Sequence, residues 1–275
     1  NKNVEALANI WKFLSENGAT RKSLMINLGG GMITDLGGFA ASTFKRGLTY
    51  INIPTTLLGA VDAAVGGKTG INFCGLKNEV GVINPADYVL IDPHFFKTLD
   101  NENFLSGYAE MLKHALIYSE EELKKILDFN LDSVNYDALR PLLAQSVAIK
   151  EEIVEKDPKE QNIRKSLNFG HTIGHAFESF SYEKKQPILH GYAVAYGMIC
   201  ELYLSHKKVG FPREKLQYVS KLIINAYGSF NITCKHYDRL YELMTHDKKN
   251  ETKDINFTLL AAVGDIRINQ IANQK

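Results

Sequence analysis

The sequence predicts an α/β domain built on a parallel sheet, followed by a mostly α-helical domain. Over roughly the first hundred residues, short apolar runs alternate with glycine turns and with apolar residues at helical spacing, which is the pattern of a parallel α/β sheet. Farther along the chain, helical spacing dominates. We therefore place the first domain at residues 1–98 and the second at residues 99–275.

Each element of the first domain follows from the spacing of its apolar residues and from the residue that ends it. Apolar residues recur at helical spacing from Val4 onward, and Gly18 follows as a stop signal. The apolar run over 24–28 is typical of a buried strand. The predicted elements are helices over 4–17 and 35–41 and strands over 24–28, 48–53 and 88–92.

The second domain is predicted to be helical almost throughout. One late apolar run, over 257–263, is typical of a strand. The predicted helices cover residues 102–118, 137–156, 167–181, 190–206, 212–226 and 236–245.

The composition of the 275 residues excludes several classes of protein. Hydrophobic residues make up 45% and charged residues 23%, as in a globular protein that buries a core. A net charge of +1 favours neither nucleic acid nor membrane as the partner, and no apolar run approaches the ~20 residues that span a bilayer. Cys74, Cys200 and Cys234 form no CxxC pair, which indicates buried, reduced thiols in a cytoplasmic protein.

Two neighbouring strand ends carry groups that suit a phosphate or a ribose. In the segment 29–35, three glycines let backbone amides approach an anion, and the helix that follows supplies positive potential. Thr55 and Thr56 add hydroxyl groups after the next strand. Because ligands gather at the carboxyl ends of parallel strands, the two ends together favour a nucleotide-binding domain. The glycine turn alone is equally consistent with a simple tight turn, since the GxGxxG pattern is absent.

A third polar segment contains Asp62, the stretch 66–70, Lys77 and Asn78. Its spacing does not fit GxxxxGK[ST], so we reject a P-loop. A glycine-bearing loop with these side chains suits a polar small-molecule pocket. A solvated loop is equally expected from this segment alone.

Candidate metal ligands lie in the second domain. His171 and His175 stand one helical turn apart, His190 begins another helical segment, and Glu110 lies on an otherwise apolar helix. Buried carboxylates and imidazoles are costly unless they are paired or bound to metal. One carboxylate and two imidazoles suit a catalytic zinc ion with an open position, but the sequence does not decide which two histidines bind.

Basic residues accompany these candidates. Lys113 is one helical turn from Glu110, Arg164 precedes His171, and Lys150 lies near the end of a long helix. In a chain of net charge +1, such a cluster indicates an anionic ligand. Taken singly, Lys150 and Arg164 are each expected to be exposed.

Together these residues resemble one family, dehydroquinate synthase. The matching stretches run in family order along nearly the whole chain, and they are specific in combination although each is weak alone. They are residues 29–35, 37–40, 46–47, 54–58, 61–62, 65–69, 77–78, 107–113, 167–175, 190–191 and 247–249.

The resemblance implies an N-terminal NAD-binding domain, a helical metal-binding domain and an active site in the cleft. It implies zinc, or cobalt in its place, on Glu110, His171 and His190, with His175 in the substrate pocket. The implied NAD contacts are Gly31, Met32, Ile33, Thr34, Asp35, Thr55, Thr56, Lys68, Lys77, Phe95, Phe96, Lys97 and Thr98.

The family converts DAHP, a seven-carbon sugar-acid phosphate, into 3-dehydroquinate and phosphate, a lyase reaction of the shikimate pathway to aromatic amino acids, with NAD used catalytically. The resemblance therefore implies a small anionic sugar phosphate as partner and a homodimer as assembly. The implied catalytic residues are Lys68, Lys113, Lys150, Arg164, Asn168 and His175, and the implied substrate contacts are Arg46, Asp62, Asn78 and one of Lys248 and Lys249.

Two departures from the family stand out. Tyr192 occupies a position where the family usually has glutamate, which puts the role of that position beside His190 in question. The family's first strand–helix unit does not precede residue 1, so we expect a chain that is N-terminally incomplete and binds NAD poorly.

Three other functions stay open from the sequence. A related sugar phosphate cyclase of the inosose or valiolone synthase type would turn over a phosphate without a carboxylate. A metal-dependent alcohol or glycerol dehydrogenase would accumulate NADH. A scaffold protein with a vestigial site would fold without retaining metal.

Overall fold

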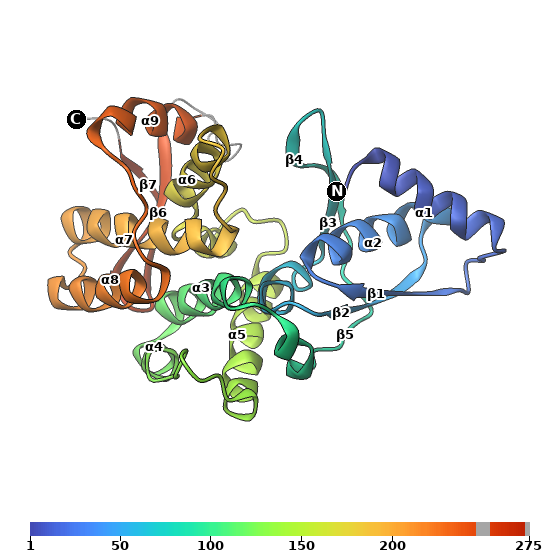
Figure 1. Cartoon of the computed structure of the whole chain (residues 1–275), viewed down its shortest axis with the longest axis horizontal. Helices are drawn as coiled ribbons and strands as arrows, with labels where there is room; N and C mark the ends of the chain where they lie inside the picture. The colour runs from blue at the N-terminus through green and yellow to red at the C-terminus, as the bar shows by residue number, and fades with distance from the viewer. Residues whose placement is uncertain (246–253, 273–275) are drawn as a thin grey trace. The chain divides into compact units, whose positions relative to one another are not determined.

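The computed structural model describes residues 1–245 and 254–272. It forms two compact units, Asn1–Gly107 and Tyr108–Lys275 (Figure 1). Helix α3 (Asn101–Tyr118) runs through this division, so the domain limits 1–98 and 99–275 remain our proposal. None of the helices in the described part of the chain has the length and apolar character needed to cross a membrane.

The first unit contains the predicted parallel sheet. Its order is β1 (Leu24–Gly29), β2 (Thr49–Pro54), β5 (Tyr88–Val89), and both pairings are parallel. Helix α2 (Gly31–Thr43) follows β1 directly. Asn27 of β1 donates a 3.0 Å hydrogen bond to Asn52 of β2, and a Cβ on Gly37 of α2 would lie 2.0 Å from the Asn27 side-chain oxygen. Helix α2 therefore packs directly on this face of the sheet.

The opposite face of β1 corrects the prediction of a buried strand. Leu24, Ile26 and Leu28 are 51%, 57% and 55% exposed, whereas Asn27 between them is buried. Successive residues of a strand point to opposite faces. Helix α2 covers only the face of Asn27, so the apolar run 24–28 is half buried at most.

The segment expected as a polar loop is mostly a β-hairpin. β3 (Lys68–Phe73) pairs antiparallel with β4 (Leu76–Ile83), and Gly75 adopts a left-handed φ of 80° at the turn. Gly70 faces Gly81 across the pair, where a Cβ on Gly81 would lie 2.0 Å from a backbone oxygen of β3. Glycines inside both strands hide the strand pattern from sequence inspection. The remaining elements of this unit are α1 (Val4–Glu16), η1 (Phe44–Arg46), η2 (Gly59–Ala63) and η3 (Pro93–Thr98).

The second unit is mostly helical, as predicted. Two elements escaped the sequence inspection, the short helix α4 and the strand β7, which pairs antiparallel with the predicted late strand β6. The elements are α4 (Glu120–Leu127), α5 (Tyr136–Lys156), η4 (Ile163–Asn168), α6 (His171–Glu183), α7 (His190–Val209), α8 (Arg213–Tyr227), η5 (Cys234–His236), α9 (Tyr237–Thr245), β6 (Ile255–Ala262) and β7 (Asp265–Ala272).

Two smaller predictions were wrong. Helix α6 begins at His171 rather than at residue 167, because Gly170 adopts a left-handed φ of 79° and separates it from the 3-10 helix η4. Cys74 and Cys234 are exposed rather than buried. Cys74 lies in the turn between β3 and β4, and Cys234 is the first residue of the short 3-10 helix η5.

Candidate metal centre and its surroundings

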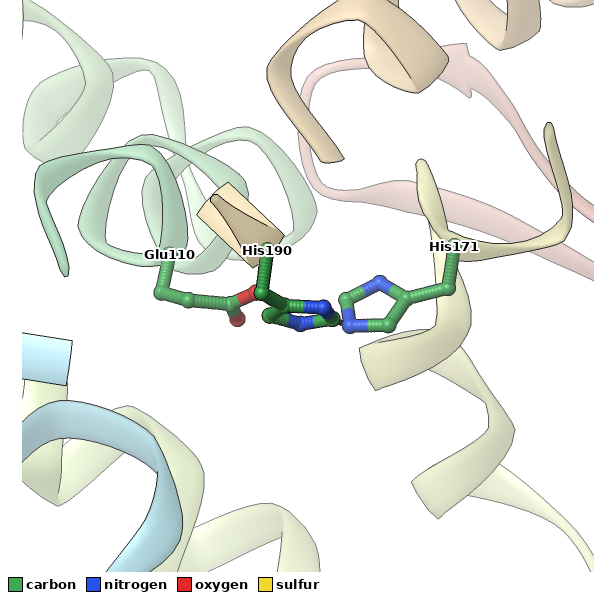
Figure 2. Close-up of side chains that lie close together, drawn as sticks. All are labelled: Glu110, His171 and His190. Atoms are coloured by element: carbon green, nitrogen blue, oxygen red, sulfur yellow. Dashed lines mark ion pairs between the residues drawn. The ribbon is translucent and has the colours of Figure 1, made fainter. Parts of the chain in front are cut away.

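Three side chains from three helices converge in the second unit. Glu110 lies within α3, His171 is the first residue of α6, and His190 is the first residue of α7. Figure 2 shows the carboxylate and the two imidazole rings pointing toward one another. One potential ligand atom from each lies within 4.8 Å of the other two. Among the described residues, these three form the group of histidine and acidic side chains that could hold a metal ion.

The spacing of these atoms fits a tetrahedral metal ion. Oε1 of Glu110 lies 3.5 Å from Nε2 of His171 and 3.6 Å from Nε2 of His190. Ligand atoms about 2.1 Å from a zinc ion at tetrahedral angles are roughly 3.4 Å apart. A carboxylate oxygen and two imidazole nitrogens also leave a fourth position for substrate, as in catalytic sites.

The Glu110 carboxylate provides a second test of fit. The side chain is fully buried, and Oε1 has no hydrogen-bond partner among the described residues. Its other oxygen, Oε2, contacts Nζ of Lys113, which is itself buried. Burial alone would raise the pKa of this carboxyl, but Lys113 and His190 hold it well below its usual range. Glu110 is therefore an anion with one oxygen available to a cation.

Each imidazole is oriented through its other nitrogen. Nδ1 of His171 lies 3.1 Å from the carbonyl oxygen of Phe169, and Nδ1 of His190 lies 3.4 Å from a carboxylate oxygen of Glu178. A hydrogen bond from Nδ1–H leaves the Nε2 lone pair free for a metal. Burial favours the neutral ring, but Glu110 and Glu178 raise the pKa of His190 to about 10. A cation that replaces the proton on Nε2 would face the carboxylate of Glu110, while Glu178 would keep its contact with Nδ1.

Close packing at glycines brings the starts of α6 and α7 together. A Cβ on Gly197 would lie 2.1 Å from the carbonyl oxygen of Gly170, and one on Gly174 would lie 3.0 Å from the carbonyl oxygen of Ala193. The two helices therefore touch backbone to backbone near their first turns. This crossing places the helix that begins with His171 beside the helix that begins with His190.

The third candidate histidine lies beside the centre. The ring of His175 is 5.3 Å from that of His171 and 5.9 Å from that of His190, measured between centroids. It is not part of the three-residue ligand group found in the described chain. The structure thus brings His171 and His190, but not His175, into one group with Glu110.

The three candidate basic residues of this unit are buried, although Lys150 and Arg164 were each expected to be exposed when taken singly. Lys113, Lys150 and Arg164 are only 1%, 6% and 3% exposed. Arg164 donates a 2.9 Å hydrogen bond from Nη1 to the carbonyl oxygen of Pro158. Long cationic side chains are rarely this buried unless they are paired.

A buried aspartate orders the segment that carries Arg164. The carboxylate of Asp157 accepts hydrogen bonds from the backbone N–H groups of Gln161, Asn162 and Arg164 at 3.0, 2.6 and 3.1 Å. Although burial opposes it, these N–H groups lower the pKa of Asp157. Asn168 then donates a 2.9 Å hydrogen bond to Glu160 in the same segment.

Two groups of predicted nucleotide contacts in the first unit, the glycine turn and the threonines after β2, lie at one edge of its sheet. Gly29 and Pro54 are register partners at the carboxyl ends of β1 and β2. A Cβ on Gly30 would lie 3.1 Å from the methyl group of Thr56, and one on Gly31 would lie 2.8 Å from Ala63. The glycine turn therefore lies against the segment that follows β2, as the shared sheet edge predicts.

The other predicted residues of this unit lie on several elements. Lys2 was not predicted, yet its Nζ contacts both Asp35 of α2 and Asn78 of β4. Thr34 and Phe96 are buried, and Arg46 is exposed with a left-handed φ of 69°. Asp62 lies in η2, Lys68 and Lys77 lie on the hairpin, and Phe95, Lys97 and Thr98 lie in η3. Lys248 and Lys249 lie outside the described residues.

Comparison with known proteins identifies the family. Residues 1–106 match the family described as 3-dehydroquinate synthase N-terminal, and residues 107–250 match the one described as 3-dehydroquinate synthase C-terminal. The chain belongs to the 3-dehydroquinate synthase family. The 3-dehydroquinate synthase of Parabacteroides distasonis is 63% identical over 270 residues, 98% of this chain and 76% of the relative. That of Clostridium acetobutylicum is 38% identical over 275 residues, 100% of this chain and 76% of the relative.

Solved structures of sugar phosphate cyclases share the fold. A 2-deoxy-scyllo-inosose synthase complexed with carbaglucose-6-phosphate, NAD+ and Co2+ is 25% identical, with a TM-score of 0.85 over 97% of this chain and 74% of that one. The 2-epi-5-epi-valiolone synthase ValA of Streptomyces hygroscopicus, with NAD+ and Zn2+ bound, is 26% identical, with a TM-score of 0.82 over 98% and 76%. The fold class predicted from sequence is thereby confirmed.

Within this member of the 3-dehydroquinate synthase family, Tyr192 is part of an aromatic cluster. Its ring packs edge-on against Tyr227 at 5.1 Å and against Tyr196 at 6.5 Å, measured between centroids. The hydroxyl of Tyr196 donates a 2.7 Å hydrogen bond to the carbonyl oxygen of Tyr227. The carboxylate beside His190 comes instead from Glu178 of α6.

Sequence inspection missed several residues around the centre, although some left a signal. His114 is fully buried one helical turn beyond Glu110 on α3, and its Nδ1 lies 2.8 Å from the hydroxyl of Ser146. Glu178 stands two helical turns beyond His171 on the same face of α6, which the helical repeat could have shown. Asp157 has no such signal, because it acts only through backbone groups of a loop.

Proposed function

We propose that this chain acts as a 3-dehydroquinate synthase, converting DAHP into 3-dehydroquinate and phosphate with catalytic NAD and a divalent metal ion on Glu110, His171 and His190. One observation carries the proposal. The buried Oε1 of Glu110 has no hydrogen-bond partner in the described chain and faces two imidazole nitrogens at 3.5 and 3.6 Å. Family membership along both halves of the chain supports the choice of reaction.

The metal would polarise substrate oxygens and acidify the hydroxyl to be oxidised, and NAD would accept and return the hydride. The work left to this chain's own residues is orientation and electrostatics. Lys113 neutralises the second oxygen of Glu110 and holds the carboxylate in place. Phe169 and Glu178 hold the Nδ1 atoms of the two histidines, which keeps both Nε2 atoms aimed at the centre.

The substrate groups are proposed for the buried cations of the second unit. Lys150 and Arg164 are basic side chains at low exposure, which suits an anionic phosphate or carboxylate as their ligand. His175 and Asn168 lie beside the ligands and the Arg164 segment, where they could donate to the same anion. Arg46, Asp62, Lys68, Asn78 and one of Lys248 and Lys249 complete the proposed set.

NAD is proposed for the edge of the first unit's sheet. The glycine turn and the start of α2 offer backbone N–H groups, and the adjoining Thr55 and Thr56 offer hydroxyls. Structures of relatives with 25% and 26% identity hold NAD+ together with Co2+ or Zn2+. We propose zinc or cobalt as the metal, a homodimer as the assembly and the shikimate pathway as the setting.

The decisive experiment follows release of phosphate and formation of 3-dehydroquinate from DAHP. Activity should require NAD, disappear with a strong chelator and return with Zn2+ or Co2+. NADH should not accumulate, because the same cofactor returns its hydride. Turnover of a hexose phosphate but not of DAHP would instead favour an inosose synthase, and net NADH formation would favour a dehydrogenase.

A further inference from the structure

We infer that Glu201 is a positioning residue for the metal centre, because its carboxylate on α7 holds the start of α6 and with it His171. The inference rests on the proposed function, since it concerns a proposed metal ligand. Glu201 is fully buried. Its two oxygens accept hydrogen bonds from the backbone N–H groups of Gly170 at 2.7 Å and Ile173 at 3.1 Å.

The donors of these two hydrogen bonds lie on either side of His171 in the sequence. Gly170 directly precedes His171, and Ile173 lies in the same first turn of α6. The first N–H groups of a helix have no partner within the helix, and they favour a negative charge. Glu201 supplies both the acceptors and the charge. The backbone that carries His171 is thereby tied to one carboxylate.

The acceptor for the N-terminal N–H groups of α6 comes from another helix, because the N-cap residue of α6 has no side chain that could accept them. The N-cap residue is Gly170, which has no side chain. A Cβ on Gly170 would lie 2.6 Å from Cγ of Met198, so a larger capping residue does not fit. The carboxylate of Glu201 reaches the helix end from α7, one turn beyond the close approach of Gly197 to Gly170.

Helix α7 therefore affects the position of both histidines, because it contains His190 and supplies the carboxylate that binds the backbone beside His171. His190 begins α7, and Glu201 lies about three turns farther along it. Glu178 makes the reverse connection, since it belongs to α6 and contacts Nδ1 of His190. Each helix thus contributes a carboxylate that fixes the ligand-bearing start of the other. The distance between the two imidazoles depends on these two carboxylate contacts.

The test compares the unmodified chain, Glu201→Gln and Glu122→Gln. Glutamine keeps the volume of Glu201 but presents one NH2 group to a backbone N–H. Glu122 is a matched control, because it is a buried glutamate of the same unit whose partner is Lys125 of α4. Three quantities are measured: the dissociation constant for Co2+ by chelator competition, the visible spectrum of the Co2+ complex, and hydrogen exchange of the 170–173 amides.

We expect Glu201→Gln to raise the Co2+ dissociation constant at least about tenfold, to alter the Co2+ spectrum and to speed exchange at 170–173. Glu122→Gln should match the unmodified chain in all three. Glu201→Asp, which keeps the charge, should restore part of the affinity and serves if the glutamine variant does not fold. A folded Glu201→Gln protein with unchanged Co2+ affinity and spectrum overturns the inference alone. Absence of Co2+ binding by the unmodified chain overturns the proposed function as well.

Discussion

Oε1 of Glu110 lies 3.6 Å from Nε2 of His190, although one belongs to α3 and the other begins α7. Without a cation, this contact is a charged pair within a buried site, because the carboxyl pKa is lowered and the imidazole pKa is raised. With a divalent cation, the same two atoms become ligands. The site can therefore hold either a proton on His190 or a metal ion.

Glu110→Gln should severely weaken metal binding. Glutamine has the volume of glutamate but lacks its charge, and it leaves Lys113 buried without its anionic partner. We expect the Zn2+ dissociation constant to rise by at least about a hundredfold and 3-dehydroquinate formation to fall below detection. Equilibrium dialysis with metal analysis measures the first. Glu122→Gln should retain metal, and stoichiometric zinc in Glu110→Gln would refute the ligand assignment.

Metal binding should release a proton from His190. Its pKa of about 10 in the metal-free protein means that the ring is protonated at pH 8. Because the metal takes only the neutral ring, affinity should rise with pH by about tenfold per unit up to the pKa. Calorimetric titration with Co2+ in buffers of different ionisation enthalpy should give about one proton released per ion. No dependence on the buffer would contradict this prediction.

The metal-free protein should show the opposite trend in stability. A histidine whose pKa is raised from about 6.5 when unfolded to about 10 when folded stabilises the fold fully below pH 6.5, and this contribution is lost as pH rises toward 10. The thermal midpoint of chelator-treated protein should therefore fall between pH 7 and pH 10. His190→Gln removes the titrating group, so its midpoint should change less over the same range.

Gly197→Ala should separate the two ligand-bearing helices. The new Cβ would lie 2.1 Å from the carbonyl oxygen of Gly170, so backbone must move. We expect unfolding in urea to show a loss of about 1–3 kcal/mol, together with weaker Co2+ binding. Gly18→Ala provides the control, since it also adds a methyl group but meets no atom within 4 Å. It should lose stability through its left-handed φ of 70° while keeping metal affinity.

The three thiols should differ sharply in reactivity. Burial, and after it Glu201, raises the pKa of the Cys200 thiol to about 12, whereas Cys74 and Cys234 are exposed. Because the thiolate is the reactive form, a colorimetric disulfide reagent at pH 8 should titrate two thiols rapidly. The third should react only on unfolding in denaturant. Rapid reaction of all three in the native protein would contradict the raised pKa of the Cys200 thiol.

Local patterns were enough for much of the fold and for the type of site. The glycine turn after β1, the helical spacing of α3, α5 and α7, and the histidine pair at 171 and 175 can all be recognised within a few residues of chain. Neighbouring residues decide these features through backbone geometry and periodicity. The hairpin β3–β4 was not predicted, because glycines at 70 and 81 interrupt the alternation of apolar and polar residues that marks a strand.

Only the tertiary structure decided which residues meet. From sequence, His171, His175 and His190 were equal candidates; the helix crossing at Gly170 and Gly197 aims two of them at Glu110 and sets the third aside. Taken singly, Lys150 and Arg164 were expected to be exposed, and folding buries both. Glu201 is an ordinary helical glutamate in the sequence and a helix cap in the fold. Such roles depend on contacts between distant segments, which arise only when helices pack.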